Sequence, residues 1–212
     1  MENDIKTGLS LRINNINLKA DLVIPGGSTG LVIFSHGSGS SRLSKRNVFV
    51  ASRLQEQKLA TLLFDLLTEE EDMIYETRFD IDLLTQRLVA VTRELNKNPQ
   101  TRDLKKGFFG ASTGAASALR AAAELGEEIQ AVVSRGGRPD MAGNTLDKVL
   151  APTLLIVGGD DEVVIQLNKQ AYALLNCEKK LEIVPGASHL FEEPGTLEEV
   201  ARLSANWFAN HL

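Results

Sequence analysis

The sequence predicts a doubly wound α/β fold, in which a mainly parallel sheet carries helices on both faces. Six continuous apolar runs recur along the chain without polar alternation, as in strands that are buried on both faces. Segments with helical spacing of apolar residues separate several of these runs, and such alternation is typical of parallel sheets. The 212 residues, of which 43% are hydrophobic, suffice for one well-filled core. We therefore expect a single domain over residues 1–212.

The strands are predicted in chain order. Residues 9–25, LSLRINNINLKADLVIP, form two strand-like runs that turn at Asn14-Asn15, which predicts an antiparallel start to the sheet. The six apolar runs that follow are 31–36, 60–66, 107–112, 129–137, 152–159 and 180–186.

Two helices are predicted from the spacing of apolar residues. The first has aspartates at its start and a proline beyond its end, and its inner face comprises Ile81, Leu84, Leu88, Val91 and Leu95. At the C-terminus Thr196 is predicted to cap a helix, with Glu199 completing a capping box. The inner face of this second helix comprises Leu197, Val200, Ala201, Ser204, Trp207 and Phe208.

Composition and charge exclude several classes of partner. A net charge of -5 gives no sustained basic surface for nucleic acid or an anionic membrane. The polar start MENDIKTGLS lacks the pattern of a secretory signal, and no run approaches the roughly 20 apolar residues of a membrane span. The single cysteine, Cys177, cannot form an internal disulfide or a cysteine metal cluster. We expect a cytoplasmic protein with neither nucleic acid nor membrane as a partner.

The pentapeptide GASTG at 110–114 places Ser112 between a predicted strand and the helix-forming segment TGAASALRAAAEL. This matches the G-x-S-x-G nucleophile elbow in its strand-turn-helix context. Such a turn strains the serine backbone, and the flanking positions must be small because strand and helix come close there. The first N–H groups of the helix point to the same place as the hydroxyl. The alternative is a glycine-rich turn without chemistry.

A serine nucleophile requires a base that an acid orients. His189, in VPGASHLFEEPG, directly follows the last predicted strand. The other two histidines are His36 in a glycine loop and His211 at a predicted solvated helix end. The segment GGDDEVV, residues 158–164, supplies Asp160 and Asp161 as candidate acids after another strand. Taken alone, His189 is equally well explained as a loop residue bonded to backbone.

Acyl transfer also requires two N–H donors for the developing oxyanion. The first predicted donor is the backbone N–H of Thr113, which follows the candidate nucleophile. The second is Ser38, in the loop HGSGSS at 36–41. The alternative for this loop is a phosphate cradle, but it lacks the Lys-Ser/Thr ending of a P-loop and no G-x-G-x-x-G pattern follows.

The segments VIFSHGSGSSR, LATLLFDLLT, FGASTGAA, VVSRGGRPD, PTLLIVGGDDEVV and VPGASHLFEEPG resemble single-domain α/β-hydrolases of the dienelactone hydrolase-like group. The resemblance runs from about residue 31 to the end and implies hydrolysis of esters or lactones. It favours Asp161 over Asp160, because Asp-Glu-Val-Val resembles the Asp-x-x-Val turn of α/β-hydrolases. It also implies the chain order serine, aspartate, histidine. Dienelactone hydrolase itself uses cysteine at the elbow; Cys177 is read here as a packed residue.

Substrate recognition is less defined by the sequence. Residues 68–80, TEEEDMIYETRFD, are read either as a mobile flap or as a solvated acidic loop. Residues 138–151 are too short for a large cap, so a small, open site is expected. The candidate substrate-binding residues are His36, Gly37, Gly39, Arg42 and Arg135. The arginines either bind a substrate carboxylate or form structural ion pairs.

The predicted function is hydrolysis of a small carboxylic ester or lactone through an acyl-enzyme on Ser112, with no metal and no organic cofactor. Two alternatives stay open: a ligand-binding or accessory protein with little turnover, and a thioesterase or peptidase with the same triad. Relatives of this group also occur beside phosphoribosyltransferase domains, which makes a partner-dependent role a further alternative. A homodimer is left open.

Overall fold

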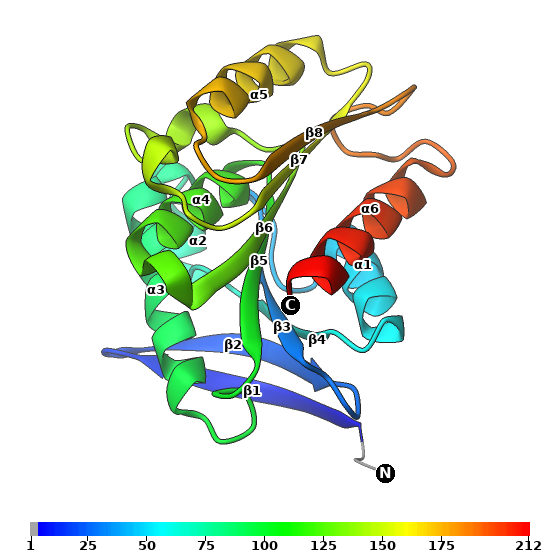
Figure 1. Ribbon diagram of the computed structural model, residues 1–212. Helices are drawn as coiled ribbons and strands as arrows, with labels where there is room; N and C mark the ends of the chain where they lie inside the picture. Colours follow the sequence, from blue (N-terminus) through cyan, green and yellow to red (C-terminus); the bar gives the residue numbers. More distant parts are fainter. Residues whose placement is uncertain (1–3) are drawn as a thin grey trace.

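An eight-stranded sheet forms the centre of the protein, as the computed structural model in Figure 1 shows. The structure describes residues 4–212, so the first three residues of the predicted domain 1–212 lie outside the described part. The strand order is β1-β2-β4-β3-β5-β6-β7-β8. The strands are β1 (Ile5–Ile13), β2 (Ile16–Ile24), β3 (Gly30–Ser35), β4 (Ala60–Phe64), β5 (Lys105–Ala111), β6 (Ile129–Arg135), β7 (Thr153–Gly158) and β8 (Lys179–Val184).

The sheet is parallel from β4 to β8; at its other end β2 pairs antiparallel with β4, and β1 pairs antiparallel with β2. Asn14, at the hairpin turn, adopts a positive φ of 52°, a conformation that asparagine tolerates better than most residues. Each predicted strand is therefore confirmed. The central strands β3, β4 and β7 are buried at every residue, which explains why they read as unbroken apolar runs.

Helices cover both faces of the sheet (Figure 1). Helices α1 and α6 contact each other over one hydrophobic cluster, whereas α3, α4 and α5 contribute to a second cluster on the other face. The helices are α1 (Lys45–Glu56), α2 (Glu69–Asp72), α3 (Ile81–Lys97), α4 (Thr113–Leu125), α5 (Glu162–Leu174) and α6 (Thr196–His211). Short 3-10 turns are η1 (Glu76–Phe79), η2 (Gly126–Glu128), η3 (Pro139–Ala142) and η4 (Leu146–Lys148).

The two predicted helices are confirmed, with one correction at a cap. In α3 all five apolar positions are buried, and the Asp80 side chain accepts the N–H of Leu83 at the N-terminus. In α6 the predicted capping box at Thr196 is wrong. Gly195 is the N-cap, with a left-handed φ of 84°, and the hydroxyl of Thr196 donates backward to the Glu193 carbonyl. A capping box does occur at α2, where Thr68 and Glu71 cap each other.

The architecture is the α/β-hydrolase fold that the resemblance implied. Residues 138–151, between β6 and β7, hold only the two short turns η3 and η4, so no large cap covers this edge of the sheet. The carboxyl ends of β5, β6, β7 and β8 lie at one edge, where ligands bind in open α/β sheets. Within residues 4–212, none of the helices combines the length and the apolar character of a membrane span.

Candidate active site

The candidate nucleophile lies in a strained turn between β5 and α4. Ser112 has φ 52° and ψ -121°, a region that a residue with a side chain occupies only when the surroundings impose it. Backbone hydrogen bonds to β6, to the loop after β6 and to α4 supply that constraint. The Ser112 N–H donates to the Arg135 carbonyl at 3.2 Å, and the Ser112 carbonyl accepts the N–H groups of Ala115 and Arg138 at 3.0 and 3.1 Å. The predicted strand-turn-helix elbow is therefore present.

The flanking glycines are required by close backbone approach, as the sequence predicts. A Cβ added to Gly110 would overlap Cα of Ala115 in the first turn of α4. A Cβ on Gly114 would overlap the Ser35 carbonyl oxygen and lie 2.5 Å from the His36 carbonyl oxygen. Helix α4 thus packs directly on the end of β3, which brings the elbow beside the glycine loop at 36–41.

The histidine and one aspartate meet, although 28 positions separate them in the chain. His189 Nδ1 and Asp161 Oδ2 are 2.6 Å apart. Because an ionised carboxylate only accepts hydrogen bonds, Nδ1 carries the proton and donates it. Nε2 is then the ring nitrogen that is able to accept a proton. The Asp161 side chain is 15% exposed and that of His189 is 38% exposed, so the imidazole remains accessible from solvent.

The two neighbouring aspartates have different environments. Asp161 occupies the N-cap position of α5, yet its carboxylate makes no capping bond and contacts His189 instead. Asp160 is exposed. Its backbone N–H donates to the Ala187 carbonyl at 3.0 Å and so joins the loop after β7 to the loop that carries His189.

One cavity of about 220 Å³ brings five of the predicted site residues together. Its lining includes Gly37, Ser38, Ser112, Arg135 and His189. These residues come from the ends of β3, β5, β6 and β8, which meet at the carboxyl edge of the sheet. We call this space the Ser112 cavity. Within residues 4–212, no group of three or more His, Cys, Asp or Glu side chains is arranged to hold a metal ion.

The predicted oxyanion donors lie side by side, with one correction. Thr113 is the first residue of α4, so its N–H has no acceptor in an earlier helical turn. The Ser38 N–H, predicted as a free second donor, donates to Thr113 Oγ1 at 2.8 Å. The physical reason is that Thr113 is almost fully buried and its hydroxyl faces the glycine loop. The Ser38 N–H therefore binds a substrate oxygen only if it shares its proton between that oxygen and Thr113 Oγ1, or if its bond to Thr113 Oγ1 breaks.

His36, predicted as a possible substrate-binding residue, does not line the Ser112 cavity; it lines another cavity together with Ser40 and Arg42. Its ring is buried; Nδ1 lies 3.0 Å from the Gly37 carbonyl oxygen, and Nε2 accepts the Leu66 N–H at 3.0 Å. Both ring nitrogens are thus used to join the loops after β3 and β4. Burial lowers the pKa of His36, against smaller opposing effects of the Gly37 carbonyl and of Asp65.

Arg42 and Gly39 do not line the Ser112 cavity either. The Arg42 guanidinium forms ion pairs with Asp21 and Asp65 at 3.1 and 2.7 Å, so the structural alternative applies to this arginine. Gly39 adopts φ 66° in the turn that the Ser40 N–H closes onto Gly37. Its role is conformational, since that backbone region disfavours residues with a Cβ.

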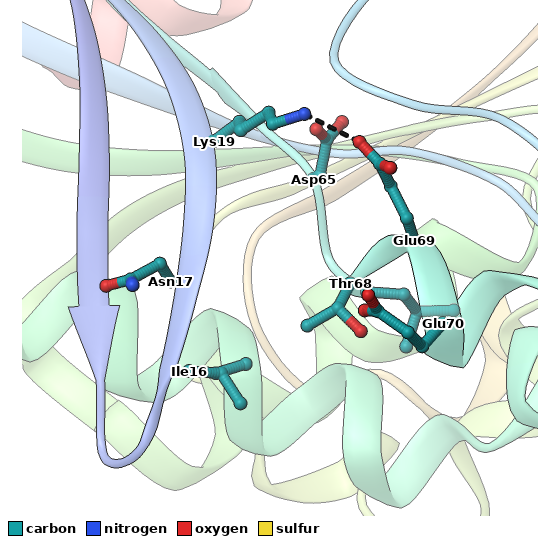
Figure 2. Close-up of a pocket in the computed structure, with 8 residues that line it drawn as sticks. Ile16, Asn17, Lys19, Asp65, Thr68, Glu69 and Glu70 are labelled. Carbon is teal, nitrogen blue, oxygen red and sulfur yellow. Dashed lines mark hydrogen bonds and ion pairs between the residues drawn. The ribbon is translucent and has the colours of Figure 1, made fainter.

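Residues 68–80, predicted as a mobile flap or a solvated acidic loop, contain two short helical turns, α2 and η1, and most of these residues are exposed. Figure 2 shows Lys19 of the β1–β2 hairpin extending toward Glu69, and their ion pair measures 2.6 Å. A cavity of about 320 Å³ lies between this hairpin and α2, and neither Ser112 nor His189 lines it. After α2, the side chains of Met73, Ile74 and Tyr75 are exposed.

Six lining residues of the Ser112 cavity are not among the predicted site residues: Ser40, Ser44, Arg46, Asn47, Ala111 and Leu190. Arg46 and Asn47, in the first turn of α1, are among its lining residues. The sequence offers a signal for their position, because Ser44 precedes them as an N-cap directly after the glycine loop. Cys177 lies elsewhere, with Sγ 3.7 Å from Thr153 Oγ1. Burial raises the pKa of the Cys177 thiol, as expected for a packed residue and not for a nucleophile.

The strand order defines a protein of the α/β-hydrolase class, with the strained Ser112 in the turn between β5 and α4. The chain belongs to the dienelactone hydrolase family, whose model matches residues 51–209. The dienelactone hydrolase of Anabaena variabilis is 54% identical, with a TM-score of 0.97 over 100% of both chains. The esterase Est1E of Butyrivibrio proteoclasticus shares the fold at 20% identity, with a TM-score of 0.81 over 96% of this chain and 98% of its own.

Two curated relatives carry a different name. Proteins of Mycobacterium tuberculosis strains CDC 1551 and H37Rv, both named as putative phosphoribosyl transferases, are 56% identical over 191 residues. The match covers 90% of this chain and 43% of each relative. The chain therefore matches less than half the length of these relatives. Their name refers to the whole of each longer protein, most of which lies outside the match.

Proposed function

We propose that the protein is a serine hydrolase that cleaves small carboxylic esters or lactones through an acyl-enzyme on Ser112. The observation that carries this proposal is the 2.6 Å contact between His189 Nδ1 and Asp161 Oδ2, with His189 and Ser112 lining one cavity. This is the arrangement that activates a serine hydroxyl, because the aspartate fixes the tautomer in which Nε2 accepts a proton. Membership of a hydrolase family and the fold of known esterases support the same reaction.

In the first half of the proposed reaction, His189 Nε2 takes the proton of Ser112 Oγ as Oγ attacks the ester carbonyl carbon. The negative charge that develops on the carbonyl oxygen is held by the Thr113 N–H, with the Ser38 N–H as second donor. The bond to the leaving alcohol then breaks, and His189 returns the proton to the alcohol oxygen. Water repeats the sequence on the acyl-enzyme and releases the acid and free Ser112.

The nucleophile is tested by labelling the protein with a fluorophosphonate probe and mapping the modified residue by mass spectrometry. We expect modification of Ser112, together with multiple turnovers of a chromogenic short-chain ester. Ser112→Ala should abolish labelling and turnover and leave the thermal midpoint nearly unchanged, because the substitution removes one oxygen atom. Full residual activity of this variant would refute the assignment. Release of at most one product per chain would instead identify a binding protein.

A partner-dependent role is favoured by one observation. The curated relatives match this chain over 191 residues and are more than twice as long, so in those proteins a hydrolase-like segment is joined to a further part. We propose as a second candidate that the protein acts together with a phosphoribosyl transferase. Co-purification from the native cells tests this candidate. Recovery of the chain without any such enzyme, with undiminished turnover of its own, would exclude it.

A further inference from the structure

Thr113 is a buried threonine whose hydroxyl joins helix α4 to the glycine loop at 36–41. The residue is only 3% exposed, and its Oγ1 atom accepts the backbone N–H of Ser38 at 2.8 Å, although 75 positions separate the two residues in the chain. Burying a hydroxyl is unfavourable unless it is hydrogen-bonded. Valine would fill the same space without a polar atom, so the hydroxyl requires an explanation.

The glycine loop leaves the Ser38 amide without an acceptor of its own. In this loop the Ser40 N–H donates to the Gly37 carbonyl at 3.2 Å, and Gly39 has the positive φ that a tight turn of type II requires at its third position. Such a turn uses the N–H of its fourth residue and not that of its second, which is Ser38 here. The Ser38 N–H therefore depends on an acceptor from another segment, and Thr113 supplies it.

The same loop lies directly against the candidate nucleophile. A Cβ added to Gly37 would lie 3.2 Å from the Ala111 carbonyl oxygen and 3.2 Å from the Ser112 Cβ atom. Gly37 and Ser38 line the Ser112 cavity together with Ser112 and His189. The direction of the Ser38 N–H is thus set at a position adjacent to the glycine that contacts Ser112.

Thr113 connects both proposed oxyanion donors. Its own N–H is the first donor, at the first position of α4, and its side chain holds the second donor, the Ser38 N–H. Because the Thr113 N–H and Oγ1 belong to the same residue, the Ser38 amide is fixed close to the Thr113 amide. Two fixed donors that lie close together are what a developing oxyanion requires.

A neutral hydroxyl is a weaker acceptor than an oxyanion. Hydrogen bonds with an ionised partner are roughly twice as strong as those between neutral groups. The Ser38 N–H is therefore able to bind an oxyanion that forms beside it, at the expense of its bond to Thr113 Oγ1. Before the reaction, that bond satisfies a backbone N–H whose burial without an acceptor would be unfavourable.

We propose that Thr113 is a positioning residue, whose hydroxyl fixes the Ser38 amide in the direction from which that amide binds the oxyanion at Ser112. This inference rests on the proposed hydrolase function and adds a residue to its mechanism. The hydroxyl acts through Ser38 and touches no reacting atom. Its contribution is preorganisation, because a donor that is already oriented needs no rearrangement when the charge develops.

Two substitutions separate the hydroxyl of Thr113 from its methyl group. Thr113→Val keeps the shape and loses the acceptor, whereas Thr113→Ser keeps the acceptor and loses the methyl group. We expect Thr113→Val to lower kcat for a chromogenic short-chain ester roughly 10- to 100-fold, because it misorients a donor whose removal costs about 10²- to 10³-fold. KM should stay within about threefold, since the oxyanion is present in the transition state and not in the bound ester. Thr113→Ser should restore most of kcat.

Thr92→Val is the matched control. Thr92 is also buried, its hydroxyl donates to the Leu88 carbonyl within α3, and it does not line the Ser112 cavity. This variant loses a buried hydroxyl of the same kind and should keep the kcat of the wild type. An equal loss of kcat in Thr92→Val and Thr113→Val would reveal a general effect on the fold and would overturn the inference.

A folding defect in Thr113→Val leaves a second comparison. Thr113→Ala and Thr113→Ser differ only in the hydroxyl oxygen, and neither adds an apolar group beside the Ser38 N–H. The proposal expects the alanine variant to lose kcat and the serine variant to retain it. Equal kcat values in these two folded variants would overturn the inference.

Inhibition by phenylboronic acid measures the oxyanion pocket directly. Ser112 Oγ loses its proton to His189 as it bonds to boron, and the tetrahedral adduct presents an oxygen at the position of the oxyanion. Because this adduct resembles the transition state, its inhibition constant in Thr113→Val should rise by about the factor by which kcat falls. A purely structural role of Thr113 would not produce this proportionality.

The outcomes distinguish this inference from the proposed function. If kcat and the inhibition constant are unchanged in Thr113→Val, the inference is wrong and the hydrolase proposal stands. A raised kcat in this variant would also overturn the inference, because Thr113 would then restrain a donor that the reaction needs free. Absence of ester turnover and of fluorophosphonate labelling in the wild type would instead overturn the hydrolase proposal, and this inference with it.

Discussion

Asp160 and Asp161 show how adjacent residues of the same type acquire different roles. The carboxylate of Asp161 gives up the N-cap of α5 and contacts the His189 ring, whereas Asp160 faces solvent and contributes its backbone N–H. Side-chain oxygens at an N-cap usually accept helix N–H groups, which stabilises a protein by about 1 kcal/mol. The chain forgoes that stabilisation at Asp161, which fits the role that we propose for this residue.

This pair provides a matched test of the acid. Asp161→Asn should lower kcat roughly 10³- to 10⁴-fold, because an amide favours the tautomer in which Nε2 already carries a proton. Asp160→Asn removes the same charge one position away and should leave kcat within about twofold. Steady-state kinetics with a chromogenic ester, at saturating substrate, compare the two variants. Equal losses in both would show that local charge matters and not the contact with His189.

At the scale of elements, the strands were predictable from the sequence because both of their faces are buried. Runs such as 31–36 and 152–159 have no polar side to interrupt them. Helix α1 was not predicted, because the residues that it buries do not form a purely apolar pattern. Its buried residues are Asn47, Val50, Ala51 and Leu54, and a buried asparagine among charged neighbours weakens the apolar period on which helix prediction depends.

The cap of α6 was predicted wrongly for a local reason. The pattern at Thr196 and Glu199 satisfies the sequence rule of a capping box, but Gly195 takes the preceding position with a left-handed φ. The first turn therefore begins one residue earlier than the rule assumes. The counter-ions of Arg42, and the absence of one at Arg135 among residues 4–212, could not be predicted from the sequence, because both depend on contacts between segments that are distant in the chain. For these arginines the sequence predicted only two alternatives, binding of a substrate carboxylate or structural ion pairing.

The packing of α4 against β3 leads to a prediction about the elbow. Gly114→Ala should destabilise the protein by about 3 kcal/mol or prevent folding, because the added methyl group overlaps the backbone of β3 and the backbone cannot rotate away. Gly8→Ala is the control. A Cβ at Gly8 meets nothing closer than 3.9 Å, and this glycine lies at an exposed position of β1. Chemical denaturation measures both variants, and a Gly114→Ala protein as stable as Gly8→Ala would contradict the close packing.

At the scale of the whole molecule, the sheet edge unites segments that the chain order separates. Ser112, Asp161 and His189 follow β5, β7 and β8, and the parallel strand order brings these ends together. The order of the three residues along the chain was predicted from the resemblance, and their meeting follows from the topology. His36 performs a related task, since its ring joins the loops after β3 and β4 on which the Ser112 cavity and the Arg42 ion pairs depend.

The buried ring of His36 connects this assembly to pH. Burial lowers the pKa of His36 in the folded protein, so the unfolded chain, with a histidine pKa of about 6.5, binds the proton more readily. The contribution of His36 to stability is therefore complete above about pH 6.5 and is lost as the pH falls through the folded-state pKa. Between these two values the free energy of unfolding should fall by up to about 1.4 kcal/mol for each pH unit.

Chemical denaturation of the wild type and of His36→Gln at several pH values between about 7 and 5 tests this contribution. Glutamine is able to accept the Leu66 N–H but does not titrate, so the variant should be less stable at neutral pH and should lose less stability on acidification. His211→Gln serves as the control, because His211 is a partly buried histidine at the end of α6 with no part in these loops. Parallel pH curves for His36→Gln and the wild type would place the acid sensitivity elsewhere in the molecule.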